Sequence, residues 1–240
     1  MIVSSTEFKT NLGKYLNLVA TEDIVILKSG RPVAKMIPCD DWSRADVLRE
    51  GIPDYNYDGQ FMSYEAFTKM NEKSEARYEY IDGQVYYLAS PNFTHQSILG
   101  RLYVLMHTFF KGKSCLPFLS PFDVTLKRSM TLFSVVQPDL LVICDLDNRN
   151  EKDRYIGTPA LVVEILSPST SKKDLAKKLD LYMSTGVEEY WIINPEEKLV
   201  LIYSFLSKEV TSFKTFTQGM PLSSIKFSEL VFDTDDLFND

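Results

Sequence analysis

The chain has 240 residues, a formal net charge of -7 and a pI near 5.0. Its 45% hydrophobic content is enough to bury a full core, so we expect one domain plus a smaller appended unit. The acidic balance argues against a strongly electrostatic, non-specific nucleic-acid binder. It leaves metal-dependent enzymes open, because clustered carboxylates belong to metal sites. No apolar run approaches bilayer length and no leader-like start is visible, so we expect a cytoplasmic protein that neither enters a membrane nor is exported.

The three cysteines, Cys39, Cys115 and Cys144, are widely scattered and show no metal-binding spacing. An odd number of unclustered cysteines is typical of reduced intracellular thiols. We therefore predict free thiols at all three positions.

The first forty or so residues form a separate small unit. An N-cap signature at residues 4–7 precedes a predicted amphipathic helix, and two short strands at residues 24–27 and 32–37 flank a hairpin turn at 28–31. One face of the helix is apolar: Phe8, Leu12, Tyr15, Leu16 and Val19. A unit this small seldom buries enough surface to be stable alone, so we expect it to pair with a second copy.

This unit resembles the N-terminal part of the Phd/YefM antitoxins, on the segments STEF (5–8), NLGKYL (11–16) and GRPVA (30–34). The resemblance implies a homodimer formed through residues 1–45 and binding to operator DNA, and it leaves a toxin or another protein open as a partner. The usual toxin-binding tail is not recognisable. Residues 46–60 instead contain Gly51, Pro53 and Gly59, which indicates a linker.

Two carboxylates in otherwise apolar runs are the strongest functional signal. Asp139 borders one run and Glu164 interrupts another, and both runs predict buried strands. An unpaired buried carboxylate costs several kcal/mol of desolvation, so positive charge is expected beside each. Mg²⁺ could supply it, since this ion commonly takes one or two carboxylates plus waters and phosphate oxygens. Alternatively, each acid faces solvent at a strand end or pairs with an Arg or Lys.

A helix follows the second acid. Hydroxyl residues at 167–171 are typical of an N-cap, and Leu175, Leu179, Tyr182 and Met183 lie at helical spacing on one face. Lys178 falls on that inward side, so it is the basic residue best placed to reach the acids. The alternative is an ordinary intrahelical pair of Lys178 with Asp174 and a core tyrosine at position 182.

Taken together, these motifs resemble the Uma2 family, which is similar to the PD-(D/E)XK, restriction-endonuclease-like nucleases. The matching segments are RYEYIDGQV (77–85), SP (90–91), HQ (95–96), PD (138–139), VEILSPST (163–170) and GVEEYWII (186–193), with Asp174, Lys178 and Tyr182. The resemblance spans roughly residues 61–206 and implies a metal-dependent phosphodiesterase with Asp139 and Glu164 as metal ligands. Where the simple motif has a Lys, two places after the Glu, this chain has Leu166, so the basic role would pass to Lys178.

Two further residues become candidates through this resemblance. Glu79 precedes a turn at residues 81–83 and would be another acid near the metal, or else a surface hairpin acid. His95 lies in the first turn of a predicted helix and could contact substrate or support the metal site, or else make a local hydrogen bond. The predicted buried face of that helix is Ile98, Leu99, Leu102, Leu105, Met106 and Phe109.

The rest of the chain shows patterns that predict structural elements without a site of their own. Residues 189–195, 198–205 and 210–216 show strand patterns that would extend the sheet beyond the two acidic strands. Seven basic residues could form a local basic surface, or they could be scattered charges that are simply solvated. They are Lys111, Lys113, Lys127, Arg128, Lys172, Lys173 and Lys177.

These patterns predict an α+β protein with an α/β core: a restriction-endonuclease-like mixed β-sheet flanked by helices, with a small N-terminal α/β dimerisation module. The expected domains are a Phd/YefM-like module (1–45), a linker (46–60) and a nuclease domain (61–240). The predicted function is hydrolysis of DNA phosphodiester bonds with Mg²⁺, or Mn²⁺ in its place. The predicted catalytic residues are Asp139, Glu164, Lys178, Glu79 and His95. The alternative is a non-catalytic, antitoxin-like DNA-binding regulator on a nuclease-derived fold.

Overall fold

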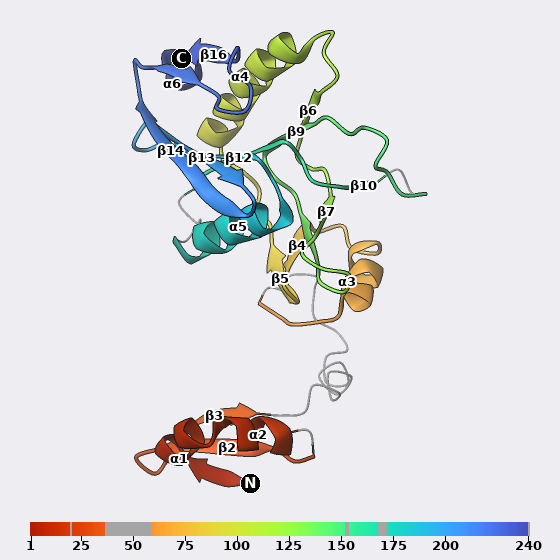
Figure 1. Cartoon of the computed structure of the whole chain (residues 1–240), viewed down its shortest axis with the longest axis vertical. Helices are drawn as coiled ribbons and strands as arrows, with labels where there is room; N and C mark the ends of the chain where they lie inside the picture. Colours follow the sequence, from red (N-terminus) through yellow and green to blue (C-terminus); the bar gives the residue numbers. More distant parts are fainter. Residues whose placement is uncertain (20, 37–58, 152–153, 168–171, 240) are drawn as a thin grey trace. The chain divides into compact units, whose positions relative to one another are not determined.

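The computed structural model describes residues 1–19, 21–36, 59–151, 154–167 and 172–239. It divides into two compact units, Met1–Asn56 and Tyr57–Asp240, which are described separately (Figure 1). Within the described ranges, no helix combines the length and hydropathy needed to cross a bilayer. Most of the predicted linker and the predicted N-cap at 168–171 lie outside those ranges.

The N-terminal unit is a three-stranded sheet with two short helices: β1 (Ile2–Ser4), α1 (Ser5–Thr10), α2 (Leu12–Leu18), β2 (Ile24–Lys28) and β3 (Arg31–Met36). The Ser4 hydroxyl accepts a hydrogen bond from the Glu7 N–H at 3.1 Å, which is the predicted N-cap. Strand β2 pairs in parallel with β1 and antiparallel with β3. Ser29 and Gly30 turn the hairpin with positive φ angles of 52° and 77°, so the predicted hairpin is confirmed.

The predicted single helix in this unit is wrong in one respect, because Asn11 interrupts it with a φ of -122°. The break leaves Phe8 on α1 and the other four predicted apolar residues on α2 or at its end. Tyr15 is buried with Val3, Ile24 and Ile26, whereas Leu12 and Leu16 remain 46% and 51% exposed. The unit therefore keeps an apolar surface that its own small core does not cover.

The larger unit contains a six-stranded sheet in the order β14-β13-β12-β11-β9-β6. Its strands are β6 (Leu116–Leu119), β9 (Leu140–Ile143), β11 (Leu161–Ile165), β12 (Glu189–Asn194), β13 (Leu199–Leu206) and β14 (Glu209–Thr217). The two acidic runs are neighbouring antiparallel strands, β9 and β11, and the three later strands extend the sheet as predicted. Helix α5 (Lys172–Thr185) connects the parallel strands β11 and β12.

Alternation along the strands gives this sheet two apolar faces. Leu140, Val142 and Val163 pack on one face with α4 (Phe93–Phe110), and Leu141 and Val162 pack on the other with α5. The predicted face of α4 is buried at Ile98, Leu99, Leu102 and Met106, while Leu105 and Phe109 are partly buried. Position 164 shares the parity of Val162, so the Glu164 side chain lies on the α5 face.

A five-stranded sheet completes the unit, in the order β10-β7-β8-β4-β5. Its strands are β4 (Tyr78–Ile81), β5 (Gln84–Tyr87), β7 (Val124–Lys127), β8 (Phe133–Val136) and β10 (Tyr155–Ile156), and α3 (Tyr64–Asn71) packs Phe67 against Tyr78 and Tyr80. Asp82 and Gly83 have φ angles of 50° and 89°, as expected for the tight turn between β4 and β5. A small hairpin and a short helix follow: β15 (Pro221–Ser223), β16 (Val231–Asp233) and α6 (Asp235–Phe238). Mixed sheets with helices make this an α+β fold, as predicted.

The prediction of reduced thiols is wrong for two of the three cysteines, because Cys115 and Cys144 form a disulfide with a sulfur separation of 2.07 Å. Strands β6 and β9 are antiparallel with Leu116 opposite Ile143, so the flanking cysteines face each other. This pairing is set by strand register, which the spacing of the cysteines along the chain does not show. Cys39 lies outside the described residues.

Substitution of Leu161 tests the assigned core, because this side chain of β11 is fully buried. Leu161→Ala should lower the free energy of unfolding by about 2 to 5 kcal/mol, from lost apolar contact and the cavity left behind. Val210→Ala on β14 is the control, since Val210 is 47% exposed. Urea unfolding followed by circular dichroism measures both. A change at Leu161 as small as the control's would contradict the assigned core.

Candidate active site

The two acids are brought together by the pairing of β9 with β11. Asp139 directly precedes β9, Glu164 lies near the end of β11, and the antiparallel register opposes Leu140 to Val163. The Asp139 carboxylate accepts a hydrogen bond at Oδ2 from the Ile165 N–H, at 2.7 Å. One acid is therefore anchored to the backbone next to the other.

His95 contacts the same Asp139 oxygen from α4. Asn92 caps this helix by accepting the His95 N–H at 2.9 Å, which fixes the histidine in the first turn. The Nε2 atom of His95 lies 3.1 Å from Asp139 Oδ2. The ring is buried, and its Nδ1 has no hydrogen-bond partner among the described residues. His95 thus orients Asp139 and carries a second polar atom that the described protein leaves unused.

Lys178 extends inward from α5, as its helical spacing predicts. Its ammonium group lies 2.8 Å from Glu164 Oε1 and 3.1 Å from Glu79 Oε1, and its side chain is 16% exposed. One turn later, the Tyr182 hydroxyl donates to Glu164 Oε1 at 2.6 Å. The hydroxyl and the ammonium group therefore hold the same oxygen of Glu164.

Glu79 is not a surface hairpin acid, because it is 3% exposed. Its Oε1 accepts hydrogen bonds from Lys178 and from the Gln137 N–H, the latter at 2.9 Å. The structure thus gathers all five predicted residues, from both sheets and from α4 and α5. Sequence reasoning did not single out Gln137 or assign Tyr182 its bond to Glu164. The available signals were the position of Gln137 just before Pro138 and Asp139, and the spacing of Tyr182 four residues after Lys178.

Burial and mutual charge shift the protonation of this cluster. Burial raises the pKa of Glu164 to about 7, against the lowering effect of Lys178, and the charges of Asp139 and Glu79 raise it further. Burial opposes the charged form of Lys178, but the carboxylates of Glu164 and Glu79 outweigh it and raise the lysine pKa. Lys178 is therefore an ammonium ion at neutral pH, while Glu164 exchanges a proton near neutrality.

Two buried tyrosines line the same region. Burial raises the pKa of both Tyr182 and Tyr190 well above the usual value, so both remain neutral phenols. Their rings pack with centroids 4.9 Å apart. The Tyr190 hydroxyl is buried and has no partner among the described residues.

The donor set fits a hard divalent cation. No group of three or more His, Cys, Asp or Glu side chains is arranged for a metal within the described ranges. Mg²⁺ does not need one, because it commonly keeps several waters and takes one or two carboxylates. The hydrogen bonds that described residues donate to the two acids go to Oδ2 of Asp139 and Oε1 of Glu164, which leaves the other oxygen of each for an ion.

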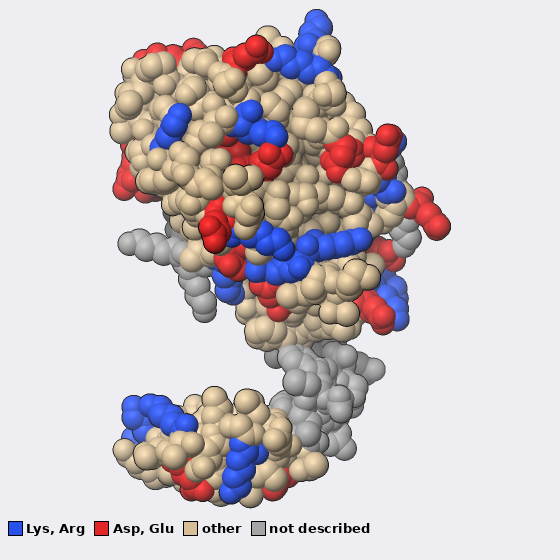
Figure 2. All heavy atoms as spheres, viewed as in Figure 1, with Lys and Arg blue, Asp and Glu red and all other residues tan. Residues whose placement is uncertain are grey.

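Some of the predicted basic surface is instead used within the fold. Lys177 donates to Gln84 and to the Tyr86 hydroxyl, and Arg128 lies 3.1 Å from Asp82 and 2.7 Å from Asp180. These contacts tie α5 to the β4–β5 hairpin. Figure 2 shows a band of Lys and Arg atoms over the region where α5 and β5 lie in Figure 1, with acidic atoms beside it.

Comparison with known proteins identifies the family of the larger unit. Residues 64–230 match Uma2, described as "Putative restriction endonuclease". The chain belongs to the Uma2 family. Residues 1–46 match "Antitoxin Phd_YefM, type II toxin-antitoxin system".

Two similar proteins are a sequence relative and a solved structure. The uncharacterized protein slr1290 of Synechocystis sp. (strain ATCC 27184 / PCC 6803 / Kazusa) is 28% identical over 143 residues, which are 59% of this chain and 73% of that protein. A crystal structure described as "a putative nuclease belonging to DUF820 from Anabaena variabilis ATCC 29413" superposes with a TM-score of 0.62 at 22% identity. The match covers 74% of this chain and 97% of that one. The Uma2 chain therefore shares its fold with that protein.

Removing the Lys178 ammonium group tests the cluster without any assay of activity. Lys178→Met should lower the free energy of unfolding at pH 8 by about 3 to 5 kcal/mol, because two buried carboxylates lose their cation. The loss should be smaller at pH 5. A carboxyl group whose pKa is raised by folding binds its proton more readily in the folded state, and a protonated Glu164 needs no cation.

The control for this variant is Lys69→Met, because Lys69 is exposed on α3. Urea unfolding at the two pH values gives the comparison. Equal losses for Lys178→Met at pH 5 and pH 8 would contradict the assigned coupling between Lys178 and Glu164.

Proposed function

We propose that this Uma2 protein is a divalent-metal-dependent endonuclease that hydrolyses DNA phosphodiester bonds. Asp139 and Glu164 would hold the ion, through the carboxylate oxygens that accept no hydrogen bond from described residues. Bound Mg²⁺ or Mn²⁺ would supply a Lewis acid for the phosphate oxygens and lower the pKa of a bound water. The family assignment and the nuclease-like fold support this proposal.

The placement of Lys178 is the observation that carries the proposal. The lysine reaches Glu164 at 2.8 Å from helix α5, whereas Leu166 directly follows β11. Because nearby carboxylates raise its pKa, Lys178 stays protonated at neutral pH and cannot act as a base. It would instead donate to a non-bridging phosphate oxygen, where negative charge grows as water attacks phosphorus.

The other residues of the cluster would position Lys178 and the two metal-binding acids. Glu79 holds the Lys178 ammonium group from the second sheet, so the lysine does not depend on Glu164 alone. His95 fixes the orientation of Asp139, and Tyr182 fixes that of Glu164. The attacking water would release one proton to solvent as its P–O bond forms. The leaving oxygen would take one proton from solvent when the other P–O bond breaks, because Lys178 donates to the phosphate.

The N-terminal unit favours a dimer in which two active sites serve one duplex. Its core consists of Val3, Tyr15, Ile24 and Ile26, and it leaves Leu12 and Leu16 exposed. The match of residues 1–46 to the Phd/YefM antitoxins also supports a second candidate function, a regulator that binds operator DNA. Cleavage assays separate the two functions, since a regulator would bind DNA without cutting it.

Plasmid cleavage tests the proposed chemistry. With Mg²⁺ or Mn²⁺ the wild type should nick or linearise the DNA, and a chelator should stop the reaction. Asp139→Ala, Glu164→Ala and Lys178→Ala should each slow cleavage by about 100-fold or more, because each removes charge from the reacting centre. Glu197→Ala is the control, since Glu197 is exposed beyond β12. Cleavage that persists in all three site variants would assign the activity elsewhere.

The raised pKa of Glu164 predicts pH-dependent metal binding. At pH 6 a carboxyl group of pKa about 7 is mostly protonated, and the ion must displace that proton. Calorimetric titration with Mn²⁺ should therefore show roughly tenfold tighter binding at pH 8 than at pH 6. An affinity that stays constant over this range would exclude Glu164 as a ligand that titrates near pH 7.

Light scattering after size exclusion tests the dimer. The full-length wild type should have twice the mass of one chain, and the double variant Leu12→Glu, Leu16→Glu should be monomeric because charge replaces the exposed apolar surface. Leu206→Glu is the control, since Leu206 is 69% exposed at the end of β13 in the other unit. A double variant that remains dimeric would place the interface elsewhere.

A further inference from the structure

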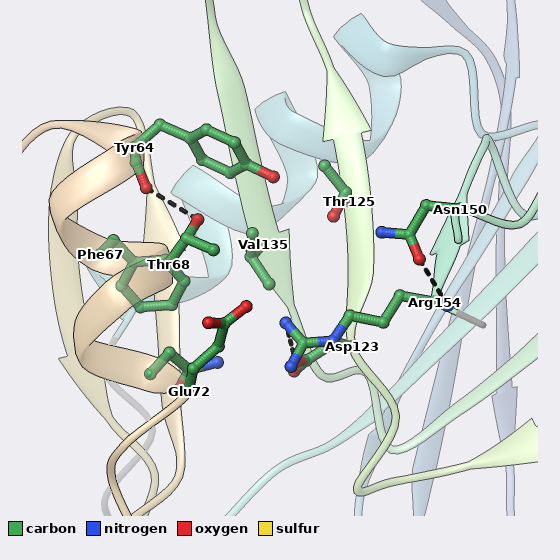
Figure 3. A pocket seen from close by; sticks show the side chains of 10 residues that line it. Tyr64, Phe67, Thr68, Glu72, Asp123, Thr125, Val135, Asn150 and Arg154 are labelled. Atoms are coloured by element: carbon green, nitrogen blue, oxygen red, sulfur yellow. Dashed lines mark hydrogen bonds and ion pairs between the residues drawn. The ribbon is translucent and has the colours of Figure 1, made fainter. Parts of the chain in front are cut away.

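Two adjoining hollows lie within Tyr57–Asp240 and are not used by the chemistry proposed above. One has a volume of about 300 Å³ and is lined by Pro121, Phe122, Asp123, Gln137 and Arg154. The other, of about 150 Å³, opens between α3 and strands β7 and β8 (Figure 3). Both are lined by Asp123 and Arg154, and their combined size is in the range of small-ligand sites, which begins at about 300 Å³.

These hollows adjoin the acid cluster through the backbone. Gln137 lines the larger hollow and also donates its N–H to Glu79 at 2.9 Å. The Ser120 N–H donates to the carbonyl of Asp139 at 3.1 Å, and the next residue, Pro121, lines the hollow. Gln137 precedes Asp139 by two residues, or about 7 Å of extended chain. A nucleotide next to the scissile phosphate would therefore reach this space.

The charged side chains that line the hollows indicate which class of ligand would bind there. Figure 3 shows the Arg154 guanidinium group extending toward Asp123, with Glu72 on the opposite wall. The Asp123 carboxylate beside the one guanidinium group disfavours a phosphate and favours a neutral ligand that has both donors and acceptors. Tyr64 and Phe122 supply flat rings, one in each hollow. A nucleobase combines these properties, because flipped bases bind by stacking and by hydrogen bonds to their edges.

The Asp123 and Arg154 pair is open enough to receive such a base. Their charged atoms are 3.9 Å apart, beyond hydrogen-bond length, and the two side chains are 18% and 37% exposed. The Asp123 Oδ1 atom is held by the Gln137 side-chain amide at 2.8 Å, which fixes the carboxylate and leaves Oδ2 facing Arg154. The Asp123 carboxylate is thus a fixed hydrogen-bond acceptor that lies beside the N–H donors of the Arg154 guanidinium group.

Guanine matches this pair better than adenine does. It offers acceptors at O6 and N7 to an arginine and donors at N1 and N2 to a carboxylate, whereas adenine has no N1–H and presents a donor at N6. We propose that the two hollows form a subsite for one guanine base of the DNA strand, next to the scissile phosphate. This assignment rests on the proposed nuclease function for its substrate, but its test needs no catalysis.

Binding of small probes to the full-length protein without metal tests the subsite. By calorimetry, dGMP should bind about tenfold more tightly than dAMP, the discrimination expected of one good bidentate contact. Asp123→Asn and Arg154→Gln should remove this difference, and both substitutions are mild enough to preserve the fold, which thermal unfolding checks. Glu65→Gln, an exposed acid on α3, is the control and should leave the preference unchanged.

Single-stranded pentamers distinguish a base in a strand from a free nucleotide. Fluorescence anisotropy should show d(TTGTT) binding more tightly than d(TTATT), with the preference lost in Arg154→Gln. Equal affinity for dGMP and dAMP would overturn the guanine subsite. Preference for dGMP without preference for d(TTGTT) would overturn the assignment to a DNA strand. Loss of plasmid cleavage would count against the nuclease and leave these binding results intact.

Discussion

The candidate site depends on the ion pairs of the Lys178 ammonium group with Glu79 and Glu164. The ammonium group lies between Glu79 from the five-stranded sheet and Glu164 from the six-stranded sheet, so one cation neutralises two buried acids and links the two sheets. Without it the two carboxylates would have to be protonated or hydrated, and neither state suits a packed junction. The same charge that neutralises the two acids would face the phosphate once substrate is bound.

Much of this arrangement could be predicted from the sequence. Alternation and apolar runs predicted β9 and β11 as buried strands, and the 3.6-residue period placed Lys178 on the inner face of α5. The turn at Asp82 and Gly83 predicted the hairpin that carries Glu79. These features are local, because backbone preference and side-chain periodicity set them within a few residues.

The rest depends on contacts between distant segments. Periodicity does not show that Glu79 is buried, because its partner Lys178 lies 99 residues away. The Cys115–Cys144 disulfide follows from the register of β6 and β9. The burial of Tyr15 and the exposure of Leu12 and Leu16 on the same helix follow from which side of α2 packs on the small sheet. The contacts of Asp123 with Gln137 and with Arg154 likewise join segments that are distant along the chain.

The central claim is that Asp139 and Glu164 are metal ligands while Lys178 remains a protonated neighbour. Anomalous diffraction from a crystal of the full-length protein soaked in Mn²⁺ tests this most directly. We predict a manganese peak bound by one oxygen of each acid at about 2.1 Å, the distance typical of such hard cations, with the Lys178 ammonium still hydrogen-bonded to Glu164. A peak elsewhere, or no ion bound to Asp139 and Glu164 at saturating Mn²⁺, would contradict it.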